Sequence, residues 1–318
     1  MARPSPSRDQ DEAIKSSRSQ ETRCGFVALI GAPNSGKSTL ANALAGAKIS
    51  IVTHKAQTTR GPVRGIVLIG KSQVILVDTP GIFQPKRRLD RAMSQAAFDR
   101  AAEADLVAVV IDAYRGLESD LDPLFAKLDE IKRPVIAVLN KIDIVAKPEL
   151  LRLAADLTGR KRFERVFMIS ALTGDGIADL KSYLANAMPE GPWLYPEDQL
   201  TDVSLRHAAA EITREKLFLR LHEELPYSLT VETTDWKELK DKSIRIEQTI
   251  YVMRESQRKI VLGAHGQTIK EIGSAARGEI AEMTGAPVHL FLFVKVRERW
   301  GEDPERYREM GLDYPKGD

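Results

Sequence analysis

The sequence predicts two domains: an α/β domain with a doubly wound, mostly parallel sheet, followed by a smaller α+β domain. Three observations support this prediction. Short β-branched runs alternate with helical patterns in the first half of the chain, a proline-rich segment follows, and the order of the elements then changes. The length of 318 residues also suits ~2 domains.

Six short apolar runs predict the strands of the first domain, with helices between most of them, as at Ala92–Ala104 and Ile177–Ala187. The expected strands are Phe26–Ile30, Val63–Ile69, Val74–Val77, Leu106–Ile111, Val135–Leu139 and Val166–Ile169. Ligands of such a sheet bind at the carboxyl ends of its strands, so motifs at these positions are the most informative.

A linker and a second domain follow. The run Pro189–Pro196 holds three prolines and a glycine, which neither a helix nor a central strand accommodates, and we expect it to carry relative motion of the domains. The elements expected beyond it are a helix at Val203–Glu224, strands at Tyr227–Thr233 and Ser243–Met253, a glycine-punctuated helical stretch at Lys259–Met283 and a strand at His289–Val296.

The predicted boundaries are a disordered tail at 1–22, the first domain at 23–190, the linker at 191–201 and the second domain at 202–318. The second domain includes a C-terminal tail, Val296–Asp318, in which both charge signs are mixed. We expect a solvated face there, with Trp300 as an anchor.

Composition narrows the function classes. With 43% hydrophobic and 29% charged residues the chain has an ordinary soluble composition, and its formal charge of +2 means that a nucleic acid must be met by a local basic patch. The single cysteine, Cys24, excludes intrachain disulfides and lies in an apolar run, where a packing role is expected. No run approaches the ~20 apolar residues of a membrane span, and the N-terminus lacks the apolar centre of a secretory signal. We therefore expect a cytoplasmic protein.

A P-loop motif, G-x-x-x-x-G-K-[ST], follows the first predicted strand and opens a helix. Its glycines let backbone N–H groups converge on phosphates, Lys37 can reach the terminal phosphates, and Ser38 can supply a hydroxyl to Mg²⁺. The residues expected to contact the nucleotide here are Gly31, Ala32, Pro33, Asn34, Ser35, Gly36, Lys37, Ser38 and Thr39.

Three later motifs, each at a strand end, favour GTP over ATP. In Asp78-Thr79-Pro80-Gly81 the aspartate can hold the magnesium shell, and the Gly81 N–H can meet a γ-phosphate. In Asn140-Lys141-Ile142-Asp143 the Asp143 carboxylate can accept two guanine N–H groups that adenine lacks, while Lys141 lies along the base. In Ser170-Ala171-Leu172 a small residue lets a backbone N–H approach guanine O6.

The segment Ile51–Arg64 is expected to fold over the γ-phosphate. Either Thr58 or Thr59 can ligate Mg²⁺ in the GTP state, and we prefer Thr59. Where a Ras-type enzyme places a water-orienting glutamine, this chain has Ile82, so intrinsic hydrolysis should be slow. The residues expected to act in catalysis are Lys37, Ser38, Thr59 and Gly81, and the metal ligands Ser38, Thr59 and Asp78.

A G-x-x-G loop between helical segments marks the second domain as a KH candidate, because its glycines let a helix–loop–helix approach RNA closely. The expected RNA-contacting residues are Arg258, Lys259, Gly263, Ala264, His265, Gly266 and Lys270. The loop carries alanine and histidine where a lysine or arginine is expected, which lowers its attraction for phosphate.

Together these residues resemble the Era family of bacterial GTPases over nearly the whole chain after the first twenty residues. The resemblance rests on Gly31–Thr39, Lys55–Arg60, Val77–Ile82 with Pro85-Lys86, Asn140–Asp143 and Val261–Gly273. Family members usually have valine at Ser35 and a more basic pair at Ala264-His265. The resemblance implies a type II KH domain and the cofactors GTP, GDP and Mg²⁺. It further implies binding near the 3′ end of 16S rRNA, favoured by GTP, and a role in assembly of the small ribosomal subunit. A monomer with a peripheral inner-membrane contact is also implied.

Two alternatives stay open on the residues alone. One is an RNA-binding protein that binds nucleotide with little turnover, which a single-turnover GTP assay would distinguish. The other is a membrane-associated GTPase without an RNA role, which cross-linking scored for 16S rRNA against lipid would distinguish.

Overall fold

The computed structural model describes residues 22–53, 55, 58–83, 85, 87–117, 121–160, 162–222, 225–298 and 300–315. The predicted disordered tail falls almost entirely on residues 1–21, which lie outside the described residues. Ala56, Gln57 and Lys86, which belong to the motifs of the family resemblance, lie outside them as well.

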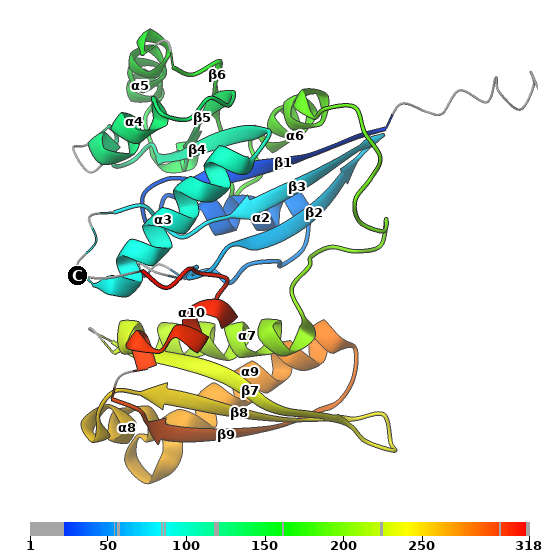
Figure 1. The fold of residues 1–318 in the computed structure, drawn as a ribbon, viewed down its shortest axis with the longest axis vertical. Coiled ribbons are helices and arrows are strands. Elements are labelled where there is room, and N and C mark those ends of the chain that lie inside the picture. Colours follow the sequence, from blue (N-terminus) through cyan, green and yellow to red (C-terminus); the bar gives the residue numbers. More distant parts are fainter. Residues whose placement is uncertain are drawn as a thin grey trace, which may run out of the picture.

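A six-stranded sheet in the order β2-β3-β1-β4-β5-β6 forms the first domain (Figure 1). Its strands are β1 (Arg23–Ile30), β2 (Val63–Ile69), β3 (Ser72–Asp78), β4 (Leu106–Asp112), β5 (Val135–Asn140) and β6 (Arg165–Met168). Only β2 runs antiparallel to its neighbour, so the predicted doubly wound, mostly parallel sheet is confirmed. Every residue of β4 is buried, as a central parallel strand requires.

Helices cover both faces of this sheet. The packing of their apolar side chains places α2 (Lys37–Ala45) and α6 (Ile177–Ala187) on one face. The other face is covered by α3 (Arg88–Glu103), α4 (Asp122–Leu128) and α5 (Lys147–Gly159). Cys24 is buried and free, as its apolar run suggested.

A three-stranded sheet, ordered β7-β8-β9, forms the second domain, with helices packed on one face. In chain order its elements are α7 (Leu205–Arg220), β7 (Leu229–Glu238), β8 (Ile244–Val252), α8 (Glu255–Leu262), α9 (Gln267–Thr284) and β9 (Val288–Val296). The order α-β-β-α-α-β, with β9 parallel to β8, is that of a type II KH domain. The helix expected at 203–224 is shorter, because Ser204 caps its start and it ends at Arg220; residues 223 and 224 lie outside the described residues.

The linker is hydrogen-bonded to the first domain. Trp193 Nε1 donates to Lys71 O at 3.1 Å, and Gln73 Oε1 accepts from Leu194 N at 2.8 Å. Further on, Leu200 O accepts from the backbone N–H of Ile66 at 2.9 Å, which adds a short bridge to the outer edge of β2. The linker is therefore hydrogen-bonded to the first domain at both its proline-rich part and Leu200.

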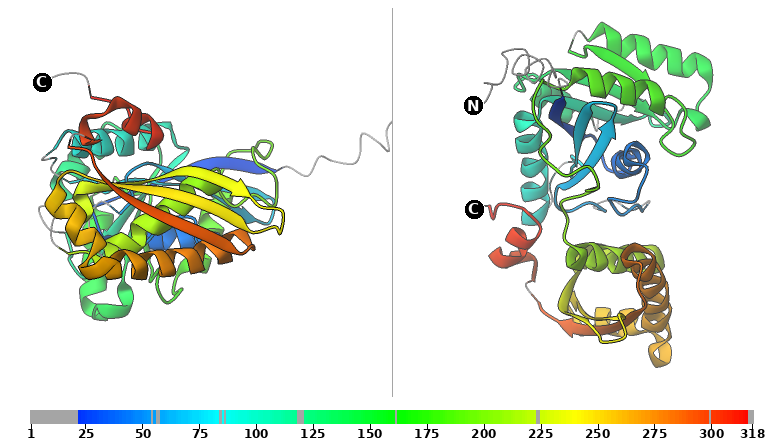
Figure 2. Two further views of the ribbon diagram at one scale, coloured as in Figure 1. Left: turned by 90° about the horizontal axis from the view of Figure 1, so that it is seen from below. Right: turned by 90° about the vertical axis from the view of Figure 1, so that its right-hand side faces the viewer.

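The C-terminal segment returns to the first domain (Figure 2). Trp300, Tyr307 and Leu312 are buried against Leu89 and Met93 of α3. Trp300 is thus the anchor that the sequence suggested. The burial of the other two means that the tail is less solvated than its charges indicated.

Candidate nucleotide and RNA sites

The P-loop, residues 31–38, joins β1 to α2 at the carboxyl edge of the sheet. Gly36 has φ of 94°, and a Cβ there would lie 2.2 Å from Asn140 Nδ2. A Cβ at Gly31 would lie 2.2 Å from Val110 O. Both positions therefore need glycine: a side chain at Gly36 would collide with the Asn140 side chain in an unfavourable backbone conformation, and one at Gly31 would collide with the backbone of β4.

Lys37 is the first residue of α2 and is buried. Its Nζ donates to Gly31 O at 3.1 Å and to Ala32 O at 2.9 Å, so the ammonium lies across the P-loop. Burial lowers the pKa of Lys37 to about 8, and the negative charge of Asp78 acts in the opposite direction. An ammonium with so little solvent around it is suited to bind an anion at this loop.

Three side-chain oxygens converge beside the P-loop. Ser38 Oγ donates to Asp78 Oδ2 at 2.7 Å, Thr59 Oγ1 donates to the same oxygen at 3.2 Å, and the two hydroxyls lie 2.9 Å apart. Asp78 is fully buried, and its Oδ1 has no hydrogen-bond partner among the described residues. Burial raises the pKa of Asp78, opposed by the Ser38 hydrogen bond and the charge of Lys37. Hydroxyl and carboxylate oxygens around an unpaired buried acceptor fit Mg²⁺.

Thr58 lies elsewhere. Its hydroxyl contacts Thr53 Oγ1 and donates to Lys55 O, both at 2.7 Å. Of the two threonines, Thr59 is therefore the one that faces Ser38 and Asp78.

The third motif packs directly on the P-loop. Thr79 Oγ1 donates to Leu29 O at 2.7 Å, and Ile82 N donates to Gly31 O at 3.0 Å. A Cβ at Gly81 would lie 2.9 Å from Pro33 Cα, so this glycine allows the approach. Ile82 is buried in the core of the first domain and offers no polar group to a water molecule.

Asn140 links the loops on the base side. Its Nδ2 donates to Ser35 O at 2.9 Å, and its Oδ1 accepts from the Ala171 N–H at 2.9 Å. One side chain therefore connects the P-loop, the end of β5 and the loop after β6. Ser170 is buried, while Leu172 is exposed at the edge of this region.

Lys141 and Asp143 follow Asn140. Lys141 has φ of 67°, and its Nζ forms an ion pair of 2.6 Å with Asp112 at the end of β4. The exposed Asp143 lies in the turn Ile142–Ile144. Sequence reasoning missed Asp112, although an acidic residue that ends a predicted strand was the available signal.

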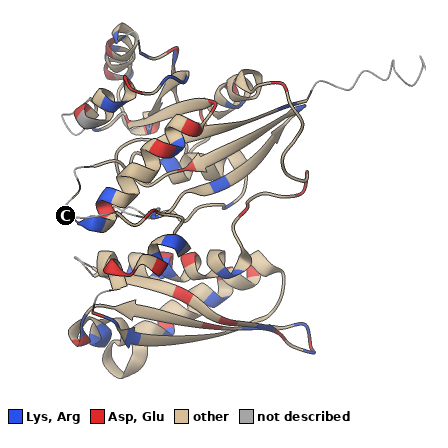
Figure 3. Ribbon diagram, viewed as in Figure 1, with Lys and Arg blue, Asp and Glu red and all other residues tan. Residues whose placement is uncertain are grey.

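The G-x-x-G loop forms the corner between α8 and α9. Gly263, His265 and Gly266 all have positive φ, and Ala264 and His265 are exposed. Lys259 and Lys270 flank the corner and are exposed, whereas Arg258 forms a 2.8 Å ion pair with Glu255. The structure thus brings the predicted RNA-contacting residues to one corner, with Arg258 partly engaged. Figure 3 shows acidic and basic residues interspersed over both domains, so attraction for RNA depends on local contacts.

Family models match both domains. The model described as "50S ribosome-binding GTPase" matches residues 26–141, and the model described as "KH domain" matches residues 224–301. Together with the geometry, they define a P-loop GTPase domain joined to a KH domain.

Relatives over the full chain are more specific. The protein is 62% identical to "GTPase Era" of Afipia carboxidovorans over 93% of this chain and 96% of the relative. It is 61% identical to "GTPase Era" of Brucella suis over 93% of this chain and 95% of the relative. The chain therefore belongs to the GTPase Era family.

Two solved structures share this architecture. A single-residue variant of Aquifex aeolicus Era bound to GDP·AlF4⁻ matches with a TM-score of 0.87 and 38% identity, covering 91% of this chain and 99% of that one. Era in complex with MgGDPNP and nucleotides 1506–1542 of 16S ribosomal RNA matches with the same TM-score, identity and coverage. None of the helices in the described part of this chain is long and apolar enough to cross a membrane.

Proposed function

We propose that this GTPase is a slow molecular switch that binds the 3′ region of 16S rRNA and assists assembly of the small ribosomal subunit in the cytoplasm. The observation that carries the proposal is the convergence of Ser38, Thr59 and Asp78 beside the P-loop. Thr59 belongs to a segment that also contacts the KH domain, so the γ-phosphate side of the site and the second domain share one loop.

Different residues are assigned to the phosphates with Mg²⁺ and to the guanine base. The P-loop N–H groups and Lys37 bind the phosphates, and the Gly81 N–H donates to the γ-phosphate. Ser38, Thr59 and Asp78 hold Mg²⁺, which offsets negative charge on the phosphates. Asp143 accepts the guanine N–H groups while Asn140 fixes the loop that carries it. The products are GDP and phosphate.

Slow turnover follows from Ile82. Its side chain is buried and apolar, so the attacking water lacks the side-chain partner that a Ras-type glutamine provides. An enzyme that hydrolyses GTP slowly is suited to act as a timer, because the bound nucleotide sets how long RNA is held.

RNA binding is assigned to the corner of the KH domain. The exposed Lys259, His265 and Lys270 supply donors, and the G-x-x-G backbone permits close approach. The solved Era complex with nucleotides 1506–1542 of 16S ribosomal RNA supports RNA binding, and the assignment to this corner rests on the KH domain and its G-x-x-G loop. Monomeric state and peripheral inner-membrane contact form the remaining part of the proposal, and they rest on the family resemblance.

The experiment pairs GTP hydrolysis with binding of a single-stranded RNA that carries the 16S 3′ sequence. His265→Asp places a negative charge on the exposed loop, and we expect it to weaken RNA binding by about tenfold or more at one fixed salt concentration. Gly263→Asp is a poorer test, because a Cβ there would lie 2.1 Å from Thr268 Oγ1 and disturb the loop itself. Unchanged RNA affinity in His265→Asp, or no RNA binding by the parent protein, would contradict the proposal.

A further inference from the structure

The loop expected to close over the γ-phosphate is also a main contact between the domains. Glu215 of α7 accepts from Val52 N at 2.8 Å and from Lys48 Nζ at 2.6 Å. Lys55 Nζ donates to the carbonyls of Phe218 and Leu221 at the C-terminal end of α7. Figure 1 shows α7 on the side of the KH domain that faces the first domain.

Arg60 makes the deepest of these contacts. Its side chain is buried, with Nη1 donating to Leu229 O at 2.7 Å and Nη2 to Pro226 O at 3.2 Å. The guanidinium carbon lies 5.8 Å from the centre of the Phe218 ring and 5.4 Å from that of Trp300. Phe218, Pro226, Leu229 and Trp300 all belong to the KH domain, and together they form the Arg60 socket.

The socket holds a positive charge without a paired carboxylate. No described acidic residue forms an ion pair with Arg60, and its Nε has no hydrogen-bond partner among the described residues. The positive charge of Arg214 lies nearby, and the carboxylates of Glu211 and Asp90 offset it only from a distance. Carbonyl dipoles and ring faces compensate a buried cation only at close range, so a small displacement removes most of their effect.

Thr59, the preceding residue, faces the opposite way. Its hydroxyl lies against Ser38 and Asp78, while the carbonyl of Thr58 accepts a hydrogen bond from Arg214 of α7. Adjacent Cα atoms are only ~3.8 Å apart. A shift of the backbone that takes Thr59 out of the proposed magnesium site therefore pulls on Arg60, whose guanidinium is held in the socket.

We propose that Arg60 is a positioning residue: its seat in the KH domain holds Thr59 at the phosphate side, and departure of Thr59 withdraws Arg60 from the socket. This inference rests on the proposed function. A displacement of α7 can reach the RNA-contacting corner, because α7 packs against α9, which begins directly after the G-x-x-G loop.

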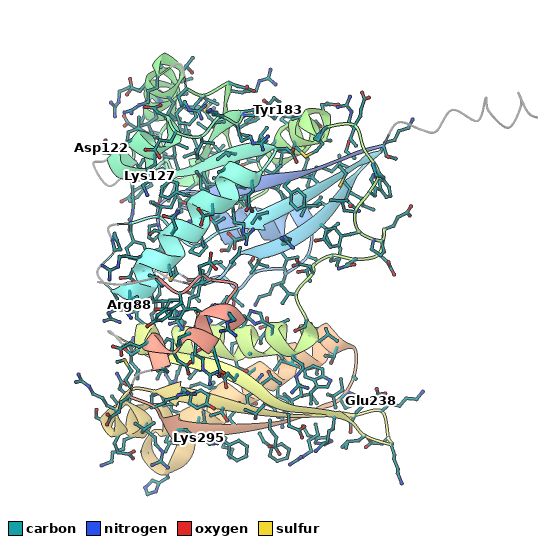
Figure 4. All side chains as sticks on the ribbon, in the orientation of Figure 1. Arg88, Asp122, Lys127, Tyr183, Glu238 and Lys295 are labelled. Carbon is teal, nitrogen blue, oxygen red and sulfur yellow. The ribbon has the colours of Figure 1, made fainter. Side chains whose placement is uncertain are left out.

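Gly61, the residue after Arg60, allows a second variant that changes the position of the same loop. A Cβ at this position would lie 1.9 Å from Met310 O, a backbone atom of the C-terminal segment. Arg88, at the start of α3, is labelled in Figure 4. It ties that segment to α3, since its Nη1 donates to Tyr314 Oη at 2.6 Å. Gly61→Ala therefore displaces the loop beside Arg60 while both the Arg60 and the Thr59 side chains are kept.

The test uses the full chain as the parent, Arg60→Ala, Gly61→Ala and, as a matched control, Arg64→Ala. Arg64 lies on the same segment but pairs at 2.9 Å with Asp202, which precedes α7 and lies outside the Arg60 socket. Each protein is titrated with GDP, with a non-hydrolysable GTP analogue plus Mg²⁺, and with the single-stranded 16S 3′ RNA in both nucleotide states.

For the parent and Arg64→Ala we expect RNA to bind more tightly with the GTP analogue, by about 5- to 150-fold. For Arg60→Ala and Gly61→Ala we expect that ratio to fall to within about twofold of unity, with weaker GTP-analogue binding and unchanged GDP binding. A purely structural role would weaken GDP and the analogue alike, which would overturn the inference. The parent ratio retained in Arg60→Ala would overturn it as well. A parent that binds RNA equally in both states would instead remove the proposed switch function.

Discussion

The proposed base side and the proposed phosphate side of the nucleotide site differ in which domains hold them. On the base side, Asn140 hydrogen-bonds to Ser35 and Ala171, and Lys141 pairs with Asp112, all within the first domain. On the phosphate side, Thr59 is flanked by residues that bond to the KH domain: Thr58 through Arg214, and Arg60 through Pro226 and Leu229.

This difference separates recognition from signalling. A base pocket closed within one domain can select guanine whatever the position of the KH domain. Under the proposed switch, a phosphate side shared between domains transmits a change in the nucleotide, because residues of one loop contact both the site and the KH domain. Substitutions on the base side should therefore change which nucleotide binds. Substitutions on the phosphate side should change how the bound nucleotide affects RNA affinity.

The largest effects are expected at the P-loop. Lys37→Ala removes the buried ammonium, and Ser38→Ala removes an oxygen beside Asp78. Loss of one contact to charge that develops during reaction costs ~100- to 1,000-fold in rate. Single-turnover GTP hydrolysis measures this. Near-parental rates in either variant would show that these residues do not serve the phosphates.

Asp143→Asn tests the base side. It removes the acceptor for two guanine N–H groups, at a cost of ~1–3 kcal/mol for each group left unpaired. Preference should shift from GTP towards xanthosine triphosphate, with the ratio of RNA affinities between nucleotide states unchanged. Competition binding with both nucleotides is the measurement, and parental GTP affinity would contradict the base-pocket assignment.

Thr59→Ala and Thr58→Ala test which of the two threonines acts on the phosphate side. Thr59 faces Ser38 and Asp78, so its loss should weaken binding of a GTP analogue with Mg²⁺ by about tenfold, the effect of ~1.4 kcal/mol. GDP binding should stay near the parental value. Thr58→Ala, the matched control, should change neither by more than about twofold. Equal effects of the two variants would mean that the loop binds through Thr58 as well.

Ile82→Ala should have the smallest effect on catalysis. Its truncation leaves a cavity and costs ~2–5 kcal/mol of stability, whereas Ile82→Val costs ~0.5–1.5 kcal/mol. Turnover per folded molecule should remain within about tenfold of the parent in both variants, because no polar contact to water is lost. Thermal unfolding separates stability from rate. A rate loss as severe as in Lys37→Ala would show that Ile82 places the water.

The sequence allowed prediction of the elements and motifs that are set by local pattern. The strand Val63–Ile69 and the helix Ile177–Ala187 were predicted with their observed bounds, and the P-loop glycines were identified from spacing alone. Contacts between residues that lie far apart along the chain could not be predicted from the sequence. The Arg60 socket joins residues that lie ~160 to 240 positions apart along the chain, and no periodicity links them.

The linker and the tail show the same limit. A proline-rich segment indicates a break between domains, yet its hydrogen bonds to Lys71 and Gln73, and the bond of the following Leu200 to β2, depend on a folded sheet. The charged tail looked solvated because Tyr307 and Leu312 are too sparse to form a helical stripe, although both are buried against α3.

The central claim is that phosphate recognition and RNA binding are linked through the shared side of the site. The direct measurement is a closed cycle on the parent protein, at one salt concentration: RNA affinity with GDP and with a GTP analogue, and affinity for both nucleotides with and without RNA. We expect the GTP analogue to tighten RNA binding by about 5- to 150-fold, and RNA to tighten binding of the analogue relative to GDP by the same factor. Equal RNA affinities in the two nucleotide states would contradict the account and leave two independent domains on one chain.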